Sequence, residues 1–187
     1  MFYALITVVV LLILIVALFI YLYNRLITLK NRVDNAWNQI EVQLKRRHDL
    51  IPNLVETVKG FMEHERETLE AVTKARQQAV EISDDNLEKQ AEAENFLTDT
   101  LRSLFAVTED YPNLKANENF LELQEELTTT ENRISFARQH YNDSVMQYNK
   151  TQEKIPYNLI ISFGDFSQRE YFEIEDPEER EAPDVEF

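Results

Sequence analysis

The feature that most constrains this chain is an uninterrupted apolar segment at its start. Phe2–Tyr23 contains no charged side chain and, apart from Thr7, only aliphatic and aromatic residues, with tyrosines near both ends. As an α-helix rising about 1.5 Å per residue it would extend about 33 Å, enough to cross a bilayer core of about 30 Å. Tyrosines are enriched where such helices meet water. We therefore predict that residues 1–24 form a transmembrane anchor that contacts the lipid bilayer.

A cleavable signal peptide is the alternative, but it would have a basic start, a shorter apolar run and a small-residue cleavage site. No Lys or Arg precedes this run, and bulky tyrosines end it. Basic residues follow at once, and positive flanks of a span stay in the cytoplasm. We therefore predict a single-pass protein of the cell (inner) membrane, with its N-terminus outside and its remaining chain in the cytoplasm. The basic residues are Arg25, Lys30 and Arg32.

Beyond the anchor, apolar residues recur every three or four positions, which is the spacing of one helix face. Only two glycines occur, so a hairpin-rich β fold would lack its turns. We predict an all-α fold: the transmembrane helix, an antiparallel four-helix bundle over residues 25–173, and a flexible acidic tail over 174–187. The four stripes are Leu26, Leu29, Val33, Trp37, Ile40 and Leu44; Ile51, Val55, Val58, Met62, Leu69 and Val72; Leu87, Ala91, Leu97, Leu101 and Leu104; and Phe120, Leu123, Leu127, Thr130, Ile134, Ala137, Tyr141 and Tyr148.

Capping residues and prolines predict where the helices begin and end. Asp85-Asn86-Leu87-Glu88 resembles a capping box that opens a third helix over about 85–109. Tyr111-Pro112 separates it from a fourth helix over about 114–152, because the residue before proline avoids helical conformation. Pro52 leaves two alternatives: the chain reverses there, or one very long helix continues with a kink. We favour the reversal, because it gives four helices of similar length.

Charge is distributed unevenly along the chain, whose net charge is −15. Residues 24–80 hold ten basic and eight acidic side chains, whereas residues 81–187 hold nine and twenty-six. A surface this acidic repels phosphates, so we expect no nucleic-acid partner. Cysteine is absent, which fits a reducing compartment. The aromatic segment after Ile155 is expected to fold back on the bundle end, and the acidic stretch from Glu170 to be a solvated tail.

No motif brings catalytic or metal-binding groups together. His64-Glu65 begins like a zinc-protease helix, but position 68 is Thr, where that motif needs a second histidine. Di-iron bundles need a carboxylate three residues before each histidine, and none of the three histidines has one. Phosphate-binding glycine loops are also missing. We predict no catalytic, cofactor-binding or metal residue, no cofactor, and no enzymatic activity.

The densest charge cluster of the basic half is Arg46, Arg47, His48 and Asp49. It could contact a protein partner or lipid headgroups. Alternatively it forms a polar cap at the bundle end that pairs with Glu131 or another acid, and we favour this second interpretation. Arg138 is a further candidate for the same polar network. Tyr141 and Tyr148, seven residues apart on one face, are expected to be core aromatics whose hydroxyls need partners.

Several motifs follow one another in order along the chain: Val33-Asp-Asn-Ala-Trp-Asn-Gln-Ile, Arg46-Arg-His-Asp-Leu-Ile-Pro-Asn-Leu-Val-Glu-Thr-Val-Lys-Gly-Phe, His64-Glu65, Ala75-Arg76, Glu109-Asp-Tyr-Pro-Asn-Leu-Lys-Ala, Phe120-Leu-Glu-Leu-Gln-Glu-Glu-Leu-Thr, Thr130-Glu-Asn-Arg-Ile, Ala137-Arg-Gln-His-Tyr-Asn and Tyr171-Phe172-Glu173. Together they resemble the LemA family over roughly residues 1–173. The resemblance implies a bacterial membrane protein with a short outside N-terminus and an antiparallel four-helix bundle over residues 25–173. It implies no established activity, although some members act in membrane remodelling or organelle formation.

Three functions follow as hypotheses. The first is a membrane-anchored scaffold or adaptor, acting through coiled-coil-like helical surfaces on other proteins or on further copies of itself as a homo-oligomer. The second is a membrane-tethered ligand or stress sensor. The third, and least favoured, is an enzyme that uses carboxylates in a bundle cleft, for which a deep polar cleft with convergent acids would be the sign.

Overall fold

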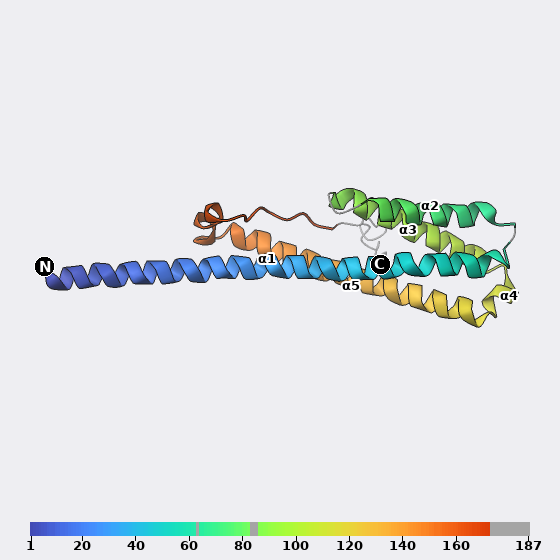
Figure 1. Cartoon of the computed structure of the whole chain (residues 1–187), viewed down its shortest axis with the longest axis horizontal. Helices are drawn as coiled ribbons and strands as arrows, with labels where there is room; N and C mark the ends of the chain where they lie inside the picture. The colour runs from blue at the N-terminus through green and yellow to red at the C-terminus, as the bar shows by residue number, and fades with distance from the viewer. Residues whose placement is uncertain (63, 83–85, 173–187) are drawn as a thin grey trace, which may run out of the picture. The chain divides into compact units, whose positions relative to one another are not determined.

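The computed structural model describes residues 1–62, 64–82 and 86–172. Every regular element in these ranges is helical, which confirms the all-α class. The predicted tail over 174–187 and the predicted capping residue Asp85 lie outside the described residues. The elements are α1 (Phe2–Lys59), α2 (Arg66–Glu81), α3 (Leu87–Thr108), α4 (Pro112–Lys115), α5 (Glu118–Gln152) and two 3₁₀ helices, η1 (Tyr157–Leu159) and η2 (Ile161–Phe163) (Figure 1).

The described chain divides into two compact units. Unit 1 comprises Met1–Val42 and Ile134–Tyr171, and unit 2 comprises Gln43–Arg133 with Phe172. Residues 2–42 of α1 and 134–152 of α5 belong to unit 1, and residues 43–59 of α1 and 118–133 of α5 belong to unit 2. Each unit is described by itself below.

The start of α1 is a candidate membrane span, since it is long and apolar enough to cross a bilayer. Every side chain from Met1 to Tyr21 is exposed, and burial begins at Leu22. A helix that is apolar on all sides and exposed along its whole length matches lipid surroundings better than water. The same helix then runs on without a loop to Lys59.

Pro52 does not reverse the chain, and the favoured alternative of four helices of similar length is wrong on this point. α1 passes through Pro52 and ends at Lys59, and the next helix, α2, begins at Arg66. Proline lacks an N–H, so the carbonyl of His48, four residues earlier, loses its helical partner. In unit 2 the Nε of Arg76, on α2, donates to that carbonyl at 2.7 Å. The bond satisfies the acceptor that proline frees, and it ties α2 to α1.

The hydrogen bond from Arg76 replaces the backbone donor that Pro52 lacks, and its contribution to stability can be tested. Arg76→Met should lower the free energy of unfolding by about 1–2 kcal/mol, because it leaves the His48 carbonyl without a donor. In a Pro52→Ala background the cost should be smaller, since the introduced alanine has a backbone N–H that can bond the same carbonyl. Thermal unfolding of the full chain in detergent, followed by circular dichroism, measures both costs. The same cost in both backgrounds would refute the assignment.

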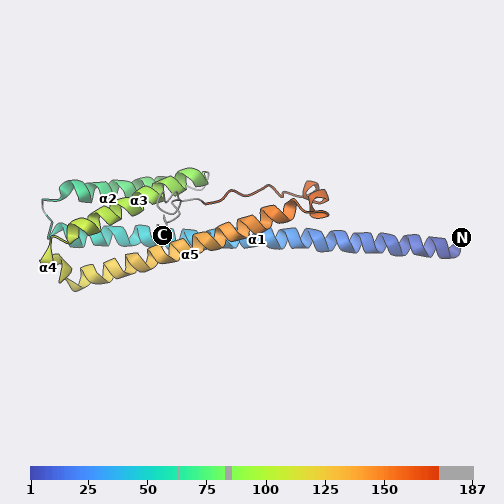
Figure 2. The same ribbon diagram turned by 180° about the vertical axis from the view of Figure 1, so that it is seen from behind.

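The core of unit 2 draws on every helix of that unit. Leu54, Val58 and Met62 from α1 and its end are fully buried, as are Val72 of α2 and Leu104 of α3. α2 and α3 lie side by side in both views (Figures 1 and 2). The predicted stripes therefore mark the buried faces, although the second stripe divides between α1 and α2. The remaining buried members are Ile51, Leu69, Ala75, Ala79, Ala93, Leu97, Leu101, Leu114, Phe120 and Leu127.

Two predicted helix boundaries can be compared with the structure. α3 begins at Leu87, and its N-cap is Asn86, whose side chain accepts the Lys89 N–H at 2.9 Å. The predicted cap was therefore placed one residue too early. The break at Pro112 is confirmed: α3 ends at Thr108, and Pro112 opens the one-turn helix α4. Proline suits a first helical position because its missing N–H would have no partner there.

In unit 1 the chain after α5 folds back along α1 and α5, as the sequence predicts for the aromatic segment. The side chain of Asn149 holds the backbone of Arg169 with two bonds, donating to its carbonyl at 2.8 Å and accepting its N–H at 3.0 Å. Tyr141 donates to the Glu170 carbonyl at 3.0 Å, which supplies the partner expected for its buried hydroxyl. Arg169 completes the attachment with an ion pair to Asp34 at 2.8 Å.

Candidate functional site

The predicted charge cluster centres on Arg47, which is among the largest fully buried side chains of the described residues. Its exposure is 1%, and Leu44 and Ile51, on the same face of α1, are buried beside it. The cluster is therefore an interior feature of unit 2 rather than the polar cap at the bundle end that we favoured. A buried guanidinium is costly unless charged and polar partners surround it.

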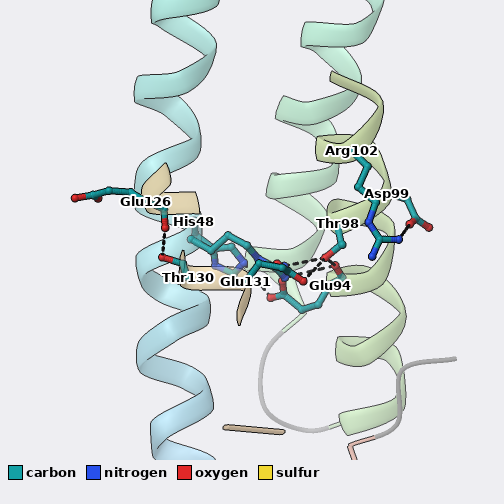
Figure 3. Close-up of polar contacts among 9 residues, drawn as sticks. His48, Glu94, Thr98, Asp99, Arg102, Glu126, Thr130 and Glu131 are labelled. Carbon is teal, nitrogen blue, oxygen red and sulfur yellow. Dashed lines mark hydrogen bonds and ion pairs between the residues drawn. The ribbon is translucent and has the colours of Figure 1, made fainter. Parts of the chain in front are cut away.

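Those partners come from α3 and α5, and together with Arg47 and His48 they form what we call the Arg47 cluster: Arg47, His48, Glu94, Thr98 and Glu131. Arg47 Nη1 donates to Glu131 Oε2 at 2.6 Å and to Thr98 Oγ1 at 2.8 Å. Its Nη2 forms an ion pair with the carboxylate of Glu94. Figure 3 shows Glu94 and Thr98 on one helix, with Glu131 and His48 converging on them. One cation thus joins three helices.

His48 completes the surroundings of Glu94. Its Nε2 lies 2.9 Å from Glu94 Oε1, and only 2% of the Glu94 side chain is exposed. The imidazole and the carboxylate are thus in direct polar contact. The two oxygens of Glu94 face different residues of α1: Oε2 pairs with Arg47, and Oε1 faces His48.

These contacts set the pKa of Glu94. Burial raises the pKa, but the hydrogen bond from His48 and the charge of Arg47 outweigh burial and bring the pKa below the ordinary value of 4.5. The folded chain therefore binds a proton on Glu94 less readily than the unfolded chain does. Stabilisation by this carboxylate is complete above about pH 4.5 and is lost as the pH falls through the depressed folded-state value.

The pH dependence of unfolding tests whether the pKa of Glu94 is lowered in the folded chain. On acidification below pH 4.5, the unfolding midpoint of the wild-type chain should fall more steeply than that of Glu94→Gln. The variant has no carboxyl group to protonate at this position, and the two chains have every other acidic residue in common. Thermal unfolding of both chains across this range measures the difference. Parallel curves would contradict a depressed pKa.

The other predicted site residues do not belong to the Arg47 cluster. Arg46 is partly exposed and pairs with Glu126 at 3.5 Å, and Asp49 is exposed. Arg138 is half-buried on α5 and belongs to unit 1, whereas the Arg47 cluster belongs to unit 2. Of the six predicted residues, the structure therefore brings together Arg47, His48 and Glu131.

Glu94 and Thr98 were missed by the sequence analysis, although a signal was present. Glu94 stands three residues after Ala91 and three before Leu97, within the third apolar stripe. A charged residue in register with a buried face needs a buried partner of opposite charge. Arg47 stands in the same way between Leu44 and Ile51 on α1. Each of the two residues is a charged residue in an otherwise apolar stripe, and their charges are opposite. This shared property could have predicted that they form a pair.

The cluster has little free capacity for chemistry. Thr98 Oγ1 lies 3.1 Å from the Glu94 carbonyl and 3.3 Å from Glu131 Oε1, so its single proton has two internal acceptors. Beside the cluster is a cavity of about 160 Å³, with Leu101, Phe105 and Leu127 among its lining residues. Within the described ranges, no group of three His, Asp or Glu side chains could hold a metal ion. Arg47 pairs with Glu94 and Glu131, so the charges of the cluster are used mainly on one another.

A larger groove lies elsewhere in unit 2, between the end of α1 and α2. Its volume is about 800 Å³. Apolar side chains, among them Val55 and Met62, line it together with three cations, Lys59, Arg66 and Lys74, and two anions, Glu56 and Glu70. Apolar surface with a small excess of positive charge suits a ligand with an apolar body and an anionic group.

Comparisons with known proteins agree with these features. The LemA family model matches residues 36–187. Magnetosome proteins MamQ 1 and MamQ 2 of Paramagnetospirillum magneticum are each 25% identical over 175 residues, which is 81% of this chain and 64% of theirs. Protein LemA of Metamycoplasma hominis is 26% identical over 126 residues, which is 67% of this chain and 57% of its own. The chain thus spans less than two thirds of these relatives' length. Because the family model covers most of the chain, the protein belongs to the LemA family.

Proposed function

We propose that this protein is a membrane-anchored helical scaffold or adaptor, which acts through contacts with further copies of itself or with other proteins at the cell membrane. The observation that carries the proposal is α1 itself. One helix of 58 residues supplies both the candidate span and core residues of each unit, with no loop between them. The names of its MamQ relatives associate those proteins with the magnetosome.

The polar interior supports a binding role more than a catalytic one. The most buried charges, Arg47 and Glu94, are paired with each other, and Glu94 also contacts His48, so both are engaged in contacts within the protein. What remains for recognition is the outer surface of the helices. Several large apolar side chains stand exposed there, namely Phe96 at 52%, Leu121 at 48% and Phe136 at 73%.

We further propose that unit 2 is an antiparallel four-helix bundle, formed by the end of α1, α2, α3 and the first half of α5. Its core contains Leu54 of α1, Val72 of α2, Leu97 of α3 and Leu127 of α5. The short connections after α1 and α2 favour helices that alternate in direction. Distances between spin labels at both ends of these helices would measure the arrangement.

Cysteine crosslinking tests the scaffold proposal directly, because the natural chain contains no cysteine. Phe96→Cys, Leu121→Cys and Phe136→Cys would be introduced one at a time and oxidised in membranes. Self-association predicts a disulfide-linked dimer at one or more of these positions, and none at the buried control Leu97→Cys. Native mass spectrometry in lipid nanodiscs gives the copy number. Monomer alone, by both methods, would refute self-assembly; crosslinking in cells followed by mass spectrometry would then test for other protein partners.

The proposed orientation places the N-terminus outside and the helical units in the cytoplasm. It is supported by Arg25, Lys30 and Arg32, which follow the span, because positive flanks stay on the cytoplasmic side. Protease added to intact cells, from which any outer envelope has been removed, should leave residues 25–187 undegraded. Permeabilised cells provide the control. Digestion in intact cells would reverse the orientation.

The groove between α1 and α2 supports a second candidate function, a membrane-tethered sensor. A ligand in the groove would touch both helices and so stabilise their contact. Thermal shift of the full chain against anionic amphiphiles, with Lys59→Gln/Lys74→Gln as the control variant, tests this function. A stabilisation that the variant loses would support it, whereas no shift with any anionic amphiphile would exclude it.

A further inference from the structure

The chain after α5 exposes three large apolar side chains within nine residues. Ile155 is 81% exposed, Leu159 65% and Phe163 69%, and they lie in and just before the 3₁₀ helices η1 and η2. Scattered apolar residues are common on protein surfaces, but a short segment that gathers several of them marks a contact with a partner or a membrane. We refer to residues 155–166 as the apolar loop.

The contacts of the apolar loop within unit 1 indicate what its exposed side chains bind. The ring of Phe163 lies edge-on to that of Phe19 with centroids 5.5 Å apart, and the ring of Phe166 lies 5.4 Å from that of Tyr23. Phe19 and Tyr23 belong to the last turns of the candidate span. Both views show the loop beside α1 at this level (Figures 1 and 2). The loop therefore stands where α1 leaves the bilayer.

The loop is attached to α1 by specific contacts rather than by apolar burial alone. Lys30 Nζ donates to the Asp165 carbonyl at 2.9 Å, directly before the buried Phe166. Gly164 allows this close turn, because a Cβ at that position would lie 2.6 Å from the Phe166 ring. With Phe166 fixed against Tyr23, the loop is kept at the end of the span.

We propose that the apolar loop enters the interfacial region of the same bilayer, as a second membrane contact beside the transmembrane helix. The proposal rests on the proposed anchoring of α1. Exposed aromatic and aliphatic side chains gain transfer free energy when they enter the layer between the lipid headgroups and the acyl chains. Exposed Lys150 and Lys154, on the chain just before the loop, and half-buried Arg25, just after the span, add the positive charge that attracts lipid phosphates.

Site-specific fluorescence in the full chain tests the proposal, since each variant carries a single cysteine. The chain would be reconstituted in vesicles of phosphatidylethanolamine and phosphatidylglycerol and labelled with an environment-sensitive dye at Leu159→Cys. Leu14→Cys reports the span, and Val42→Cys is the matched control, an apolar and exposed residue of unit 1 outside the loop. Lipids with a nitroxide near the headgroup or near the chain end provide depth-dependent quenching.

The expected result is blue-shifted emission at positions 14 and 159, with shallow quenching at 159, and water-like emission at 42. Water-like emission at 159 with blue-shifted emission at 14 would overturn the apolar loop proposal and leave the anchor intact. Water-like emission at 14 would overturn the anchor itself. Blue-shifted emission at 159 that lipid nitroxides do not quench would mean that a second protein copy covers the loop, and would also refute the proposal.

A second measurement guards against effects of the dye. With the label moved to Ser162→Cys, the triple variant Ile155→Gln/Leu159→Gln/Phe163→Gln should lose the blue shift that the otherwise natural loop shows. All three side chains are exposed, so their replacement should leave the helical circular dichroism unchanged. An equal blue shift with and without the substitutions would exclude lipid contact through these residues.

Discussion

Glu94→Ala is expected to lower the free energy of unfolding by about 3–5 kcal/mol, the cost of removing one partner of a buried ion pair. The side chains of Arg47 and Glu94 are each only 2% exposed, so neither charge can turn to water when the other is removed. For a chain of this size the loss corresponds to a fall in the unfolding midpoint of roughly 10 °C. Thermal unfolding in detergent, followed by helical circular dichroism, measures it.

Two further variants separate the unpaired charge from a general loss of packing. Glu131→Ala should cost much less than Glu94→Ala, because 39% of the Glu131 side chain is exposed and water can replace it. Arg47→Met/Glu94→Leu should recover much of the lost stability, since apolar groups of similar volume often replace a buried pair at little cost. A double variant no more stable than Glu94→Ala would show that the unpaired charge is not the cause.

Removing residues 2–23 should transfer the protein completely from the membrane fraction to the soluble fraction. Insertion of about twenty aliphatic and aromatic residues, at roughly 0.3–0.6 kcal/mol each, contributes on the order of 10 kcal/mol to membrane partition. No charged side chain in this segment opposes insertion. Carbonate-washed membranes, analysed by immunoblotting of the tagged chain, provide the measurement.

A polyleucine segment of the same length is the control for this deletion. It should restore membrane retention, because lipid affinity depends on length and apolarity rather than on the natural order of residues. A truncated chain that stayed with washed membranes would contradict the assignment of Phe2–Tyr23 as the anchor. If the polyleucine chain is retained but no longer crosslinks to itself, the natural span would also contribute to assembly.

The sequence predicts the helical faces well, because the spacing of apolar residues is a local property. Leu26, Ile40, Leu104 and Ile134 were all expected on inward faces, and all are buried. The path at Pro52 could not be predicted in this way. Whether a proline breaks a helix depends on what replaces its missing donor, and here the replacement, Arg76, lies on another helix.

Prediction from the sequence has a similar limit for the buried charges. Arg47 was a candidate through the density of charge around it, yet the same density suggested an exposed cap. Its main partner, Glu94, lies 47 residues further on, and nothing local connects the two. Periodicity could have assigned both to apolar faces, but only the packing of α3 against α1 determines that they meet.

The Arg47 cluster also bears on which arrangement of the helices can form. A stripe of small and aliphatic residues on α3 would pack almost as well against α1 after sliding by one helical turn, about 5.4 Å. That slip would carry Glu94 and Thr98 away from Arg47 and leave a guanidinium in an apolar interior. One arginine that needs acceptors from two other helices thus makes misaligned packings of this amphipathic chain unfavourable, and it favours a single alignment among several that leucines and alanines alone would accept.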